Sequence, residues 1–104
     1  DDTIHAGRYG GEEFLILFSG YTRKQAGKIL EGMLTNFRNQ EYDFLPEDVI
    51  ITFSAGFTYL DNKNMDVEGF IKCADEALYY SKEHGRNQIT YYNDLRLRDM
   101  QVNR

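Results

Sequence analysis

Two glycines and two glutamates stand directly in front of an apolar run, in the stretch RYGGEEFLILF at residues 8–18. Because glycine has no side chain, a phosphate can approach the backbone N–H groups around Gly10 and Gly11. An adjacent carboxylate, Glu12 or Glu13, can hold a magnesium ion that neutralises the same phosphates. The stretch therefore suggests a metal-assisted phosphate site. The alternative is a turn in which the glycines only set the geometry and the glutamates only stay hydrated.

A β-hairpin is the element that would position these residues. Residues 3–8 and 14–18 are predicted to be its two strands, because Gly10 and Gly11 can take the positive φ that tight turns require. The two glutamates then lie at the tip of the hairpin.

A first helix is predicted to follow the hairpin. Thr22 is a candidate N-cap, and Gln25 three residues later completes a capping-box pattern. Apolar residues then recur at helical spacing, which predicts about four to five turns. These residues are Ala26, Ile29, Leu30, Met33 and Phe37.

The second half of the chain predicts a strand, a helix and a short strand. Apolar residues alternate with other residues from Val49 to Tyr59, which is the two-residue period of a strand. Asp66 can cap a second helix, and Gly85 suits the left-handed position just past its end. The buried stripe of this helix is predicted to contain Val67, Phe70, Ile71, Ala74 and Leu78. The stretch QITYY then returns as a strand, so the element order predicts an α+β fold with an antiparallel or mixed central sheet and packed helices.

Composition sets further limits on the function. The 104 residues fit one domain, and no apolar run is long enough to cross a bilayer, so we expect a protein without direct membrane contact. The formal net charge of −5 argues against a general nucleic-acid surface. The single cysteine, Cys73, allows no internal disulfide and suits a reducing cytoplasm. His5 and His84 have no partner at metal-ligand spacing and are read without a chemical role.

Two separated motifs resemble one known family. RYGGEEF is similar to the GGEEF form of the motif that names the GGDEF domain of diguanylate cyclases, and ADEALYYSKEHGRNQI resembles the last helix of that domain. ITFSAGFTYL resembles a strand that lies between them. The resemblance covers only the C-terminal portion of the family's palm-like nucleotidyl-cyclase fold, so we expect residues 1–92 to be a partial GGDEF domain. Residues 93–104 are expected to be a tail or connector.

The resemblance implies an enzyme that condenses two GTP molecules into cyclic di-GMP and releases pyrophosphate at the interface of two GGDEF domains. It implies that Glu12 binds Mg²⁺ or Mn²⁺ and helps to deprotonate the attacking hydroxyl, with Glu13 supporting the metal. Gly10 and Gly11 would lie along the phosphates. Lys82 and Arg86 would contact the terminal phosphates, although a cation at Lys82 is also explained by the dipole of the predicted helix.

The resemblance also implies strands, helices and motifs of the family's domain that are not found in this sequence. A first strand with a metal-binding aspartate and the guanine-contacting helices are not found in it, so the isolated 104-residue chain is expected to be inactive. The family's inhibitory Arg-x-x-Asp site for product would fall on Asp1 and Ile4, so no product-inhibition site is expected. An N-terminal sensory or regulatory domain and a cytoplasmic location, including the cytoplasmic part of a membrane-bound sensor, complete these expectations.

Two other functions remain open from the sequence. The first is a non-catalytic GGDEF domain that senses GTP or a cyclic dinucleotide, against which the intact GGEEF and the pair Lys82 and Arg86 argue. The second is a small interaction module in which the hairpin tip binds neither magnesium nor GTP.

Overall fold

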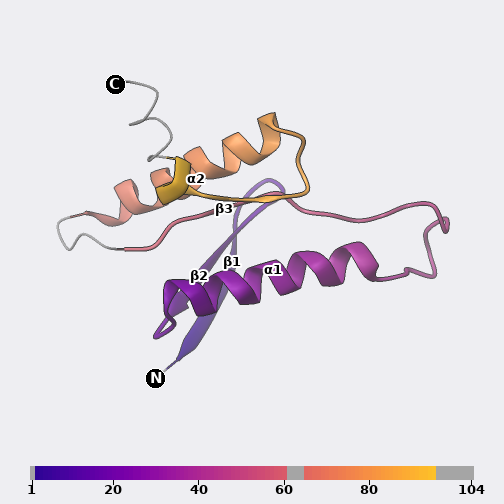
Figure 1. The fold of residues 1–104 in the computed structure, drawn as a ribbon, viewed down its shortest axis with the longest axis horizontal. Coiled ribbons are helices and arrows are strands. Elements are labelled where there is room, and N and C mark those ends of the chain that lie inside the picture. Colours follow the sequence, from indigo (N-terminus) through magenta and orange to yellow (C-terminus); the bar gives the residue numbers. More distant parts are fainter. Residues whose placement is uncertain (1, 61–64, 96–104) are drawn as a thin grey trace. The chain divides into compact units, whose positions relative to one another are not determined.

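The computed structural model describes residues 2–60 and 65–95, which form an α+β fold (Figure 1). The elements, in order, are β1 (Thr3–Gly10), β2 (Glu13–Ser19), α1 (Arg23–Asn39), β3 (Ala55–Phe57), α2 (Val67–Glu83) and β4 (Ile89–Tyr91). The chain divides into two compact units, one up to Leu30 and the other from Glu31 onward. The predicted fold class and element order are confirmed.

The first unit contains the predicted hairpin. β1 and β2 pair antiparallel, from Thr3 opposite Ser19 to Gly10 opposite Glu13, with an irregularity in register between Arg8 and Gly10. Both strands are slightly longer than the sequence pattern predicted. Their large apolar side chains are mostly exposed, and Phe14 has 71% of its surface accessible.

The capping box predicted at the start of α1 is present. The Thr22 backbone N–H donates to the Gln25 side-chain oxygen at 2.9 Å, and the Gln25 backbone N–H donates to the Thr22 hydroxyl at 3.1 Å. These reciprocal bonds satisfy backbone donors that the first helical turn leaves without partners. The Thr22 pattern therefore predicted the start of the helix within one residue.

The second unit is built around a parallel pair of strands. β3 and β4 pair in register from Ala55 opposite Ile89 to Phe57 opposite Tyr91, and α2 connects them and contacts both. A helical crossover is the usual way to join parallel neighbours. Asp66 caps α2 as predicted, because its carboxylate accepts the Gly69 backbone N–H at 2.7 Å. Figure 1 shows α2 lying along β3.

Gly56 allows the backbones of β3 and α2 to come into direct contact. A Cβ placed on Gly56 would overlap the Ala74 carbonyl oxygen and the Leu78 nitrogen, and would lie 2.8 Å from the Ala77 carbonyl carbon. Next to this contact, Ala77 and Ser81 on α2 are fully buried. The Ser81 hydroxyl lies 2.8 Å from the Ala55 carbonyl oxygen and 2.7 Å from the Thr90 hydroxyl, so one buried side chain joins the helix to both strands.

Two details of the sequence-based predictions were wrong. The strand predicted from Val49 to Tyr59 is reduced to Ala55–Phe57, because a strand needs a hydrogen-bonded neighbour and β4 is only three residues long. The predicted buried stripe of α2 was also wrong, because the face that meets β3 is centred on Ala77, next to Gly56. Ala77 and Ser81 are fully buried, whereas Val67 is 72% exposed and the other predicted positions are half-buried, namely Phe70, Ile71, Ala74 and Leu78. On α1, Leu34 is buried, whereas Phe37 keeps 38% of its surface accessible and makes an edge contact with Phe53.

Candidate functional site

The tip of the β1–β2 hairpin is an open turn whose backbone is accessible. A Cβ on Gly10 or on Gly11 would meet no atom within 4 Å, and Gly11 has a φ of +34°, which disfavours residues with a side chain. The Arg8 guanidinium donates to the Gly11 carbonyl from Nε at 2.8 Å and from Nη2 at 2.6 Å. These two bonds fix the turn from one side and leave open space above both glycines.

Glu12 and Glu13 follow this turn, with Glu12 exposed and Glu13 opening β2. Their carboxylates are hard oxygen donors of the kind that Mg²⁺ takes, and Mg²⁺ commonly uses one or two carboxylates together with substrate phosphates. Within residues 2–60 and 65–95, no group of three or more His, Cys, Asp or Glu side chains could hold a metal. The two carboxylates at the hairpin tip would fit part of a divalent-cation site, and its other ligands would have to be phosphates, water or further residues.

Lys82 and Arg86 lie at the other end of the chain, where α2 finishes. Lys82 is in the last turn of the helix, and Gly85 takes the predicted positive φ, at 107°. The Arg86 backbone N–H donates to the Ser81 carbonyl at 2.9 Å, which is the long-range bond of a Schellman helix end. The Arg86 side chain is exposed.

At this helix end, His84 contacts Tyr80 through hydrogen bonds and through ring stacking. The His84 backbone N–H and ring Nδ1 lie 3.0 and 2.9 Å from the Tyr80 carbonyl oxygen, which can only accept, so His84 donates twice. The His84 ring also stacks on the Tyr80 ring, with centroids 3.7 Å apart. These contacts place His84 at the C-terminal end of α2.

Arg38 on α1 contacts the loop after α2. Its Nε donates to the Asn87 side-chain oxygen at 2.7 Å, and its Nη2 donates to the Asn87 carbonyl at 2.9 Å. No motif or spacing in the sequence singles out Arg38. It lies 49 residues from Asn87, and a single sequence carries no local signal that links the two.

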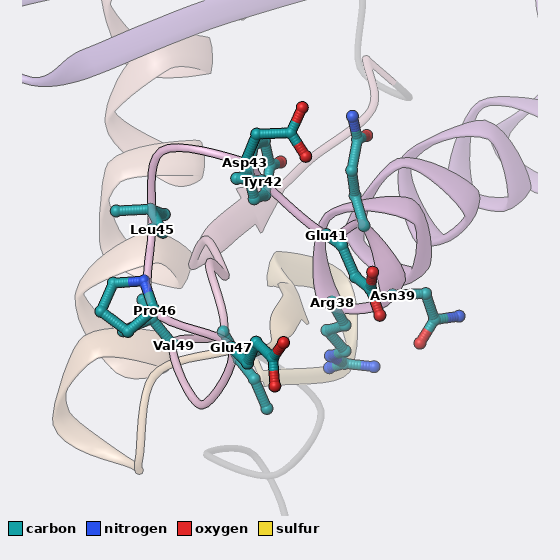
Figure 2. Close-up of a pocket in the computed structure, with 11 residues that line it drawn as sticks. Arg38, Asn39, Glu41, Tyr42, Asp43, Leu45, Pro46, Glu47 and Val49 are labelled. Carbon is teal, nitrogen blue, oxygen red and sulfur yellow. The ribbon is translucent and has the colours of Figure 1, made fainter.

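A hollow of about 400 Å³ lies between the end of α1 and the loop that follows it, but it contains none of the predicted site residues. Figure 2 shows Arg38 and Asn39 on one side of it and Leu45 and Pro46 on the other. Its lining mixes carboxylates of the loop, such as Glu41, with apolar side chains. We assign no chemistry to this hollow.

The structure thus groups the predicted site residues in two places. Gly10, Gly11, Glu12 and Glu13 meet at the hairpin tip in the first unit, and Lys82 and Arg86 lie at the end of α2 in the second unit. Asp1 is one of the two positions on which the expected lack of a product-inhibition site was based, and it lies outside the described residues. Residues 96–104 of the expected tail also lie outside them. In the part of the chain that the structure describes, we find no helix with the length and apolarity needed to span a membrane.

Comparison with known proteins decides the family. Residues 2–88 match the family model described as diguanylate cyclase, GGDEF domain. The chain belongs to the GGDEF family. The GGDEF domain of DgcB from Caulobacter crescentus, solved in complex with c-di-GMP, superposes with a TM-score of 0.76 at 29% sequence identity. That match covers 86% of this chain and 54% of the DgcB chain.

Several curated relatives of this GGDEF chain are named diguanylate cyclases. Diguanylate cyclase A of Treponema denticola is 31% identical over 88 residues, which cover 82% of this chain and 23% of the relative. A diguanylate cyclase of Vibrio cholerae is 31% identical over 91 residues, which cover 88% of this chain and 28% of the relative. The chain therefore spans about a quarter of the length of these relatives. The predicted family membership is confirmed.

Proposed function

We propose that this GGDEF chain is part of a diguanylate cyclase that condenses two GTP molecules into cyclic di-GMP and releases pyrophosphate. The observation that carries the proposal is the open glycine turn at Gly10 and Gly11, followed directly by Glu12 and Glu13, in a chain of this family. Each new bond would join a ribose 3′-oxygen to the α-phosphorus of the other nucleotide while pyrophosphate leaves. Because the product is cyclic and built from two nucleotides, we propose that two GGDEF domains face each other, each holding one GTP.

The hairpin tip would bind the phosphates of GTP and accept the proton of the attacking 3′-hydroxyl. Backbone around Gly10 and Gly11 would approach the phosphates, because no side chain occupies the space above either residue. Glu12 would accept the proton of the attacking 3′-hydroxyl as a general base. Glu12 and Glu13 would hold Mg²⁺ or Mn²⁺, which when bound neutralises phosphate charge and lowers the pKa of a coordinated hydroxyl.

Lys82 and Arg86 would contact the terminal phosphates of GTP. Arg86 is exposed and lies beyond the last residue of α2, so the helix dipole explains its position less well than that of Lys82. Charge-assisted hydrogen bonds from these cations would offset the negative charge that the phosphates bring to an acidic chain. We further propose that the full-length protein acts in the cytoplasm, where an N-terminal regulatory domain controls it.

The proposal is tested by product analysis on the full-length protein. Incubation with GTP and Mg²⁺ should yield cyclic di-GMP and pyrophosphate in a ratio of one to two, resolved by chromatography and a coupled pyrophosphate assay. A protein that binds GTP in calorimetry but forms no pyrophosphate would instead be the non-catalytic sensor. Absence of both binding and turnover would leave only an interaction module.

A further inference from the structure

The loop that carries Arg86 has an unusual backbone. Three consecutive residues have positive φ: Gly85 at 107°, Arg86 at 60° and Asn87 at 51°. Left-handed backbone costs free energy in residues that have a Cβ, and it persists only where the surroundings hold it. Asparagine tolerates this region better than most residues do, but arginine has no such preference. The backbone at Arg86 and Asn87 therefore needs support from other parts of the second unit.

Arg38 provides two of the three hydrogen bonds that hold Asn87. Its Nε holds the Asn87 side chain and its Nη2 holds the Asn87 carbonyl, at 2.7 and 2.9 Å. A planar guanidinium presents these donors in a fixed fork, which the single ammonium of a lysine cannot reproduce. Ser54 adds a third bond, because its hydroxyl accepts the Asn87 backbone N–H at 3.1 Å. Asn87 is thus held by α1 and by the segment before β3.

The backbone of Arg86 is held on both sides. Its N–H donates to the Ser81 carbonyl at 2.9 Å, and its carbonyl accepts from the Gln88 side-chain nitrogen at 3.2 Å. The Gln88 nitrogen also donates to the His84 carbonyl at 2.6 Å. Since the backbone sets the Cα–Cβ direction, these bonds fix the point from which the exposed Arg86 side chain extends.

We infer that Arg38 is a positioning residue for the proposed phosphate contact of Arg86. The inference rests on the proposed function, because it concerns the same site. A guanidinium that is already presented in one place binds phosphate more tightly than one whose loop must first be ordered. When the loop spends only part of its time in the competent conformation, the apparent affinity is the intrinsic affinity multiplied by that fraction of time. Arg38 therefore raises the affinity for GTP without contacting the nucleotide.

The test replaces Arg38 in the full-length protein and compares two nucleotides. Arg38→Met removes the fork but keeps an extended apolar side chain. We expect the affinity for a GTP analogue that cannot be turned over to fall about three- to tenfold with Mg²⁺ present. The affinity for GMP, which lacks the terminal phosphates, should change less than about twofold. Arg38→Lys keeps the charge and should give an intermediate loss.

A double variant shows whether Arg38 acts through Arg86. In an Arg86→Ala background, adding Arg38→Met should leave the ratio of GTP to GMP affinity unchanged. Lys28→Met, which removes an exposed cation from the same helix, is the matched control and should change neither affinity. Thermal unfolding is measured for each variant. If Arg38→Met fails to fold, Asn87→Gly keeps the left-handed backbone accessible, removes the side-chain acceptor, and should give a smaller loss that is selective for GTP.

The possible failures can be told apart. Equal weakening of GTP and GMP by Arg38→Met, or a GTP-selective effect that persists in the Arg86→Ala background, would overturn the positioning role alone. If Arg86→Ala by itself left the preference for GTP over GMP unchanged, the proposed phosphate contact would fail, and the positioning role would fail with it. A GTP-selective loss that disappears in the Arg86→Ala background would support both.

Discussion

The hairpin tip and the β3–α2–β4 segment differ in how their residues are held. At the hairpin, large apolar side chains such as Phe14 are exposed, and the turn is fixed by a local contact between Arg8 and Gly11. In β3–α2–β4, backbones touch at Gly56 and the buried Ser81 joins the helix to both strands. The carboxylate and glycines proposed for the hairpin tip thus lie where burial is low, whereas α2 is joined to β3 and β4 through the fully buried Ser81.

This difference separates function from stability. A substitution at an exposed turn removes a chemical group but few packing contacts, whereas a substitution in a close-packed crossing is felt throughout the segment. Changes at Glu12 should therefore alter the reaction with little effect on unfolding, and changes at Gly56 should do the reverse. Substitutions in each region can test whether the two properties are separate.

The largest change is expected for Glu12→Gln in the full-length protein. Glutamine keeps the size and a carbonyl ligand but loses the charge that would hold the cation and accept a proton, so turnover should fall about a hundredfold or more. The measurement is the rate of pyrophosphate release at saturating GTP and Mg²⁺, together with the midpoint of thermal unfolding. Glu76→Gln, an exposed carboxylate on α2, serves as the control. An unchanged rate for Glu12→Gln would remove this residue from the mechanism.

Gly56→Ala should destabilise the fold more than any of the site substitutions does. The new Cβ would overlap backbone atoms of Ala74 and Leu78, which can be relieved only by moving β3 away from α2. Overpacking of this kind costs roughly 1–3 kcal/mol, and we expect a value at the upper end. Denaturant unfolding measures it.

Gly32→Ala is the matched control for Gly56→Ala. Gly32 lies within α1, and a Cβ there would meet no atom within 4 Å. Alanine should therefore stabilise the helix by roughly 0.5–1 kcal/mol. If both substitutions changed the stability alike, the close contact at Gly56 would not be the cause.

Replacing both Lys82 and Arg86 by alanine should weaken GTP binding about tenfold or more while GMP binding changes little. The reason is that GMP lacks the phosphates that these cations would contact. Titrations with both nucleotides in the presence of Mg²⁺ measure the difference, and Lys72→Ala on α2 is the control. Equal weakening for GTP and GMP would return both residues to a structural role at the helix end.

The smallest change is expected for Tyr91→Phe and depends on pH. Burial, followed by the hydrogen bond to Glu31 at 2.6 Å, raises the pKa of the Tyr91 hydroxyl in the folded state. The unfolded chain then loses this proton first, at the ordinary tyrosine pKa of about 10. The contribution of Tyr91 to stability is therefore complete below that pH and is lost as the pH rises above it.

Wild type and Tyr91→Phe are best compared by denaturant unfolding across this pH range. The wild type should lose stability more steeply above about pH 10 than Tyr91→Phe does. Other tyrosines and the lysines titrate in both proteins, so the difference between the two curves isolates Tyr91. Parallel curves would show that Tyr91 titrates alike in the folded and unfolded states.

Much of the fold could be predicted from local patterns. Helix starts at Thr22 and Asp66 are encoded within four residues, and the glycine turn at Gly10 and Gly11 indicates its hairpin. The extent of β3 could not be predicted, because strand pairing depends on a partner distant in the sequence. The exposure of Val67 was missed for a similar reason, since helical periodicity does not show which turns reach the sheet.

In the candidate site, too, some features could be predicted from local sequence and others depend on residues that are far apart in the sequence. Gly10, Gly11, Glu12 and Glu13 are contiguous, so their chemistry can be read from one stretch, and their roles stay predictions until they are measured. The contact between Arg38 and Asn87 connects residues that are far apart in the sequence, and the left-handed backbone at Arg86 is not indicated by its residue type. Only the folded arrangement brings these features together.

The parallel pairing of β3 with β4 also has a kinetic consequence. The hairpin pairs residues close in sequence, and such hairpins form in microseconds. Ala55 can meet Ile89 only after the whole of α2 has been brought back along the strand, and an isolated helix of this length is marginal in water. We therefore expect closure of that long loop to be coupled to completion of the helix, and this strand pair to form later than the hairpin. The loop that bears Arg86 lies between α2 and β4, so we expect it to acquire its left-handed backbone only when this strand pair forms.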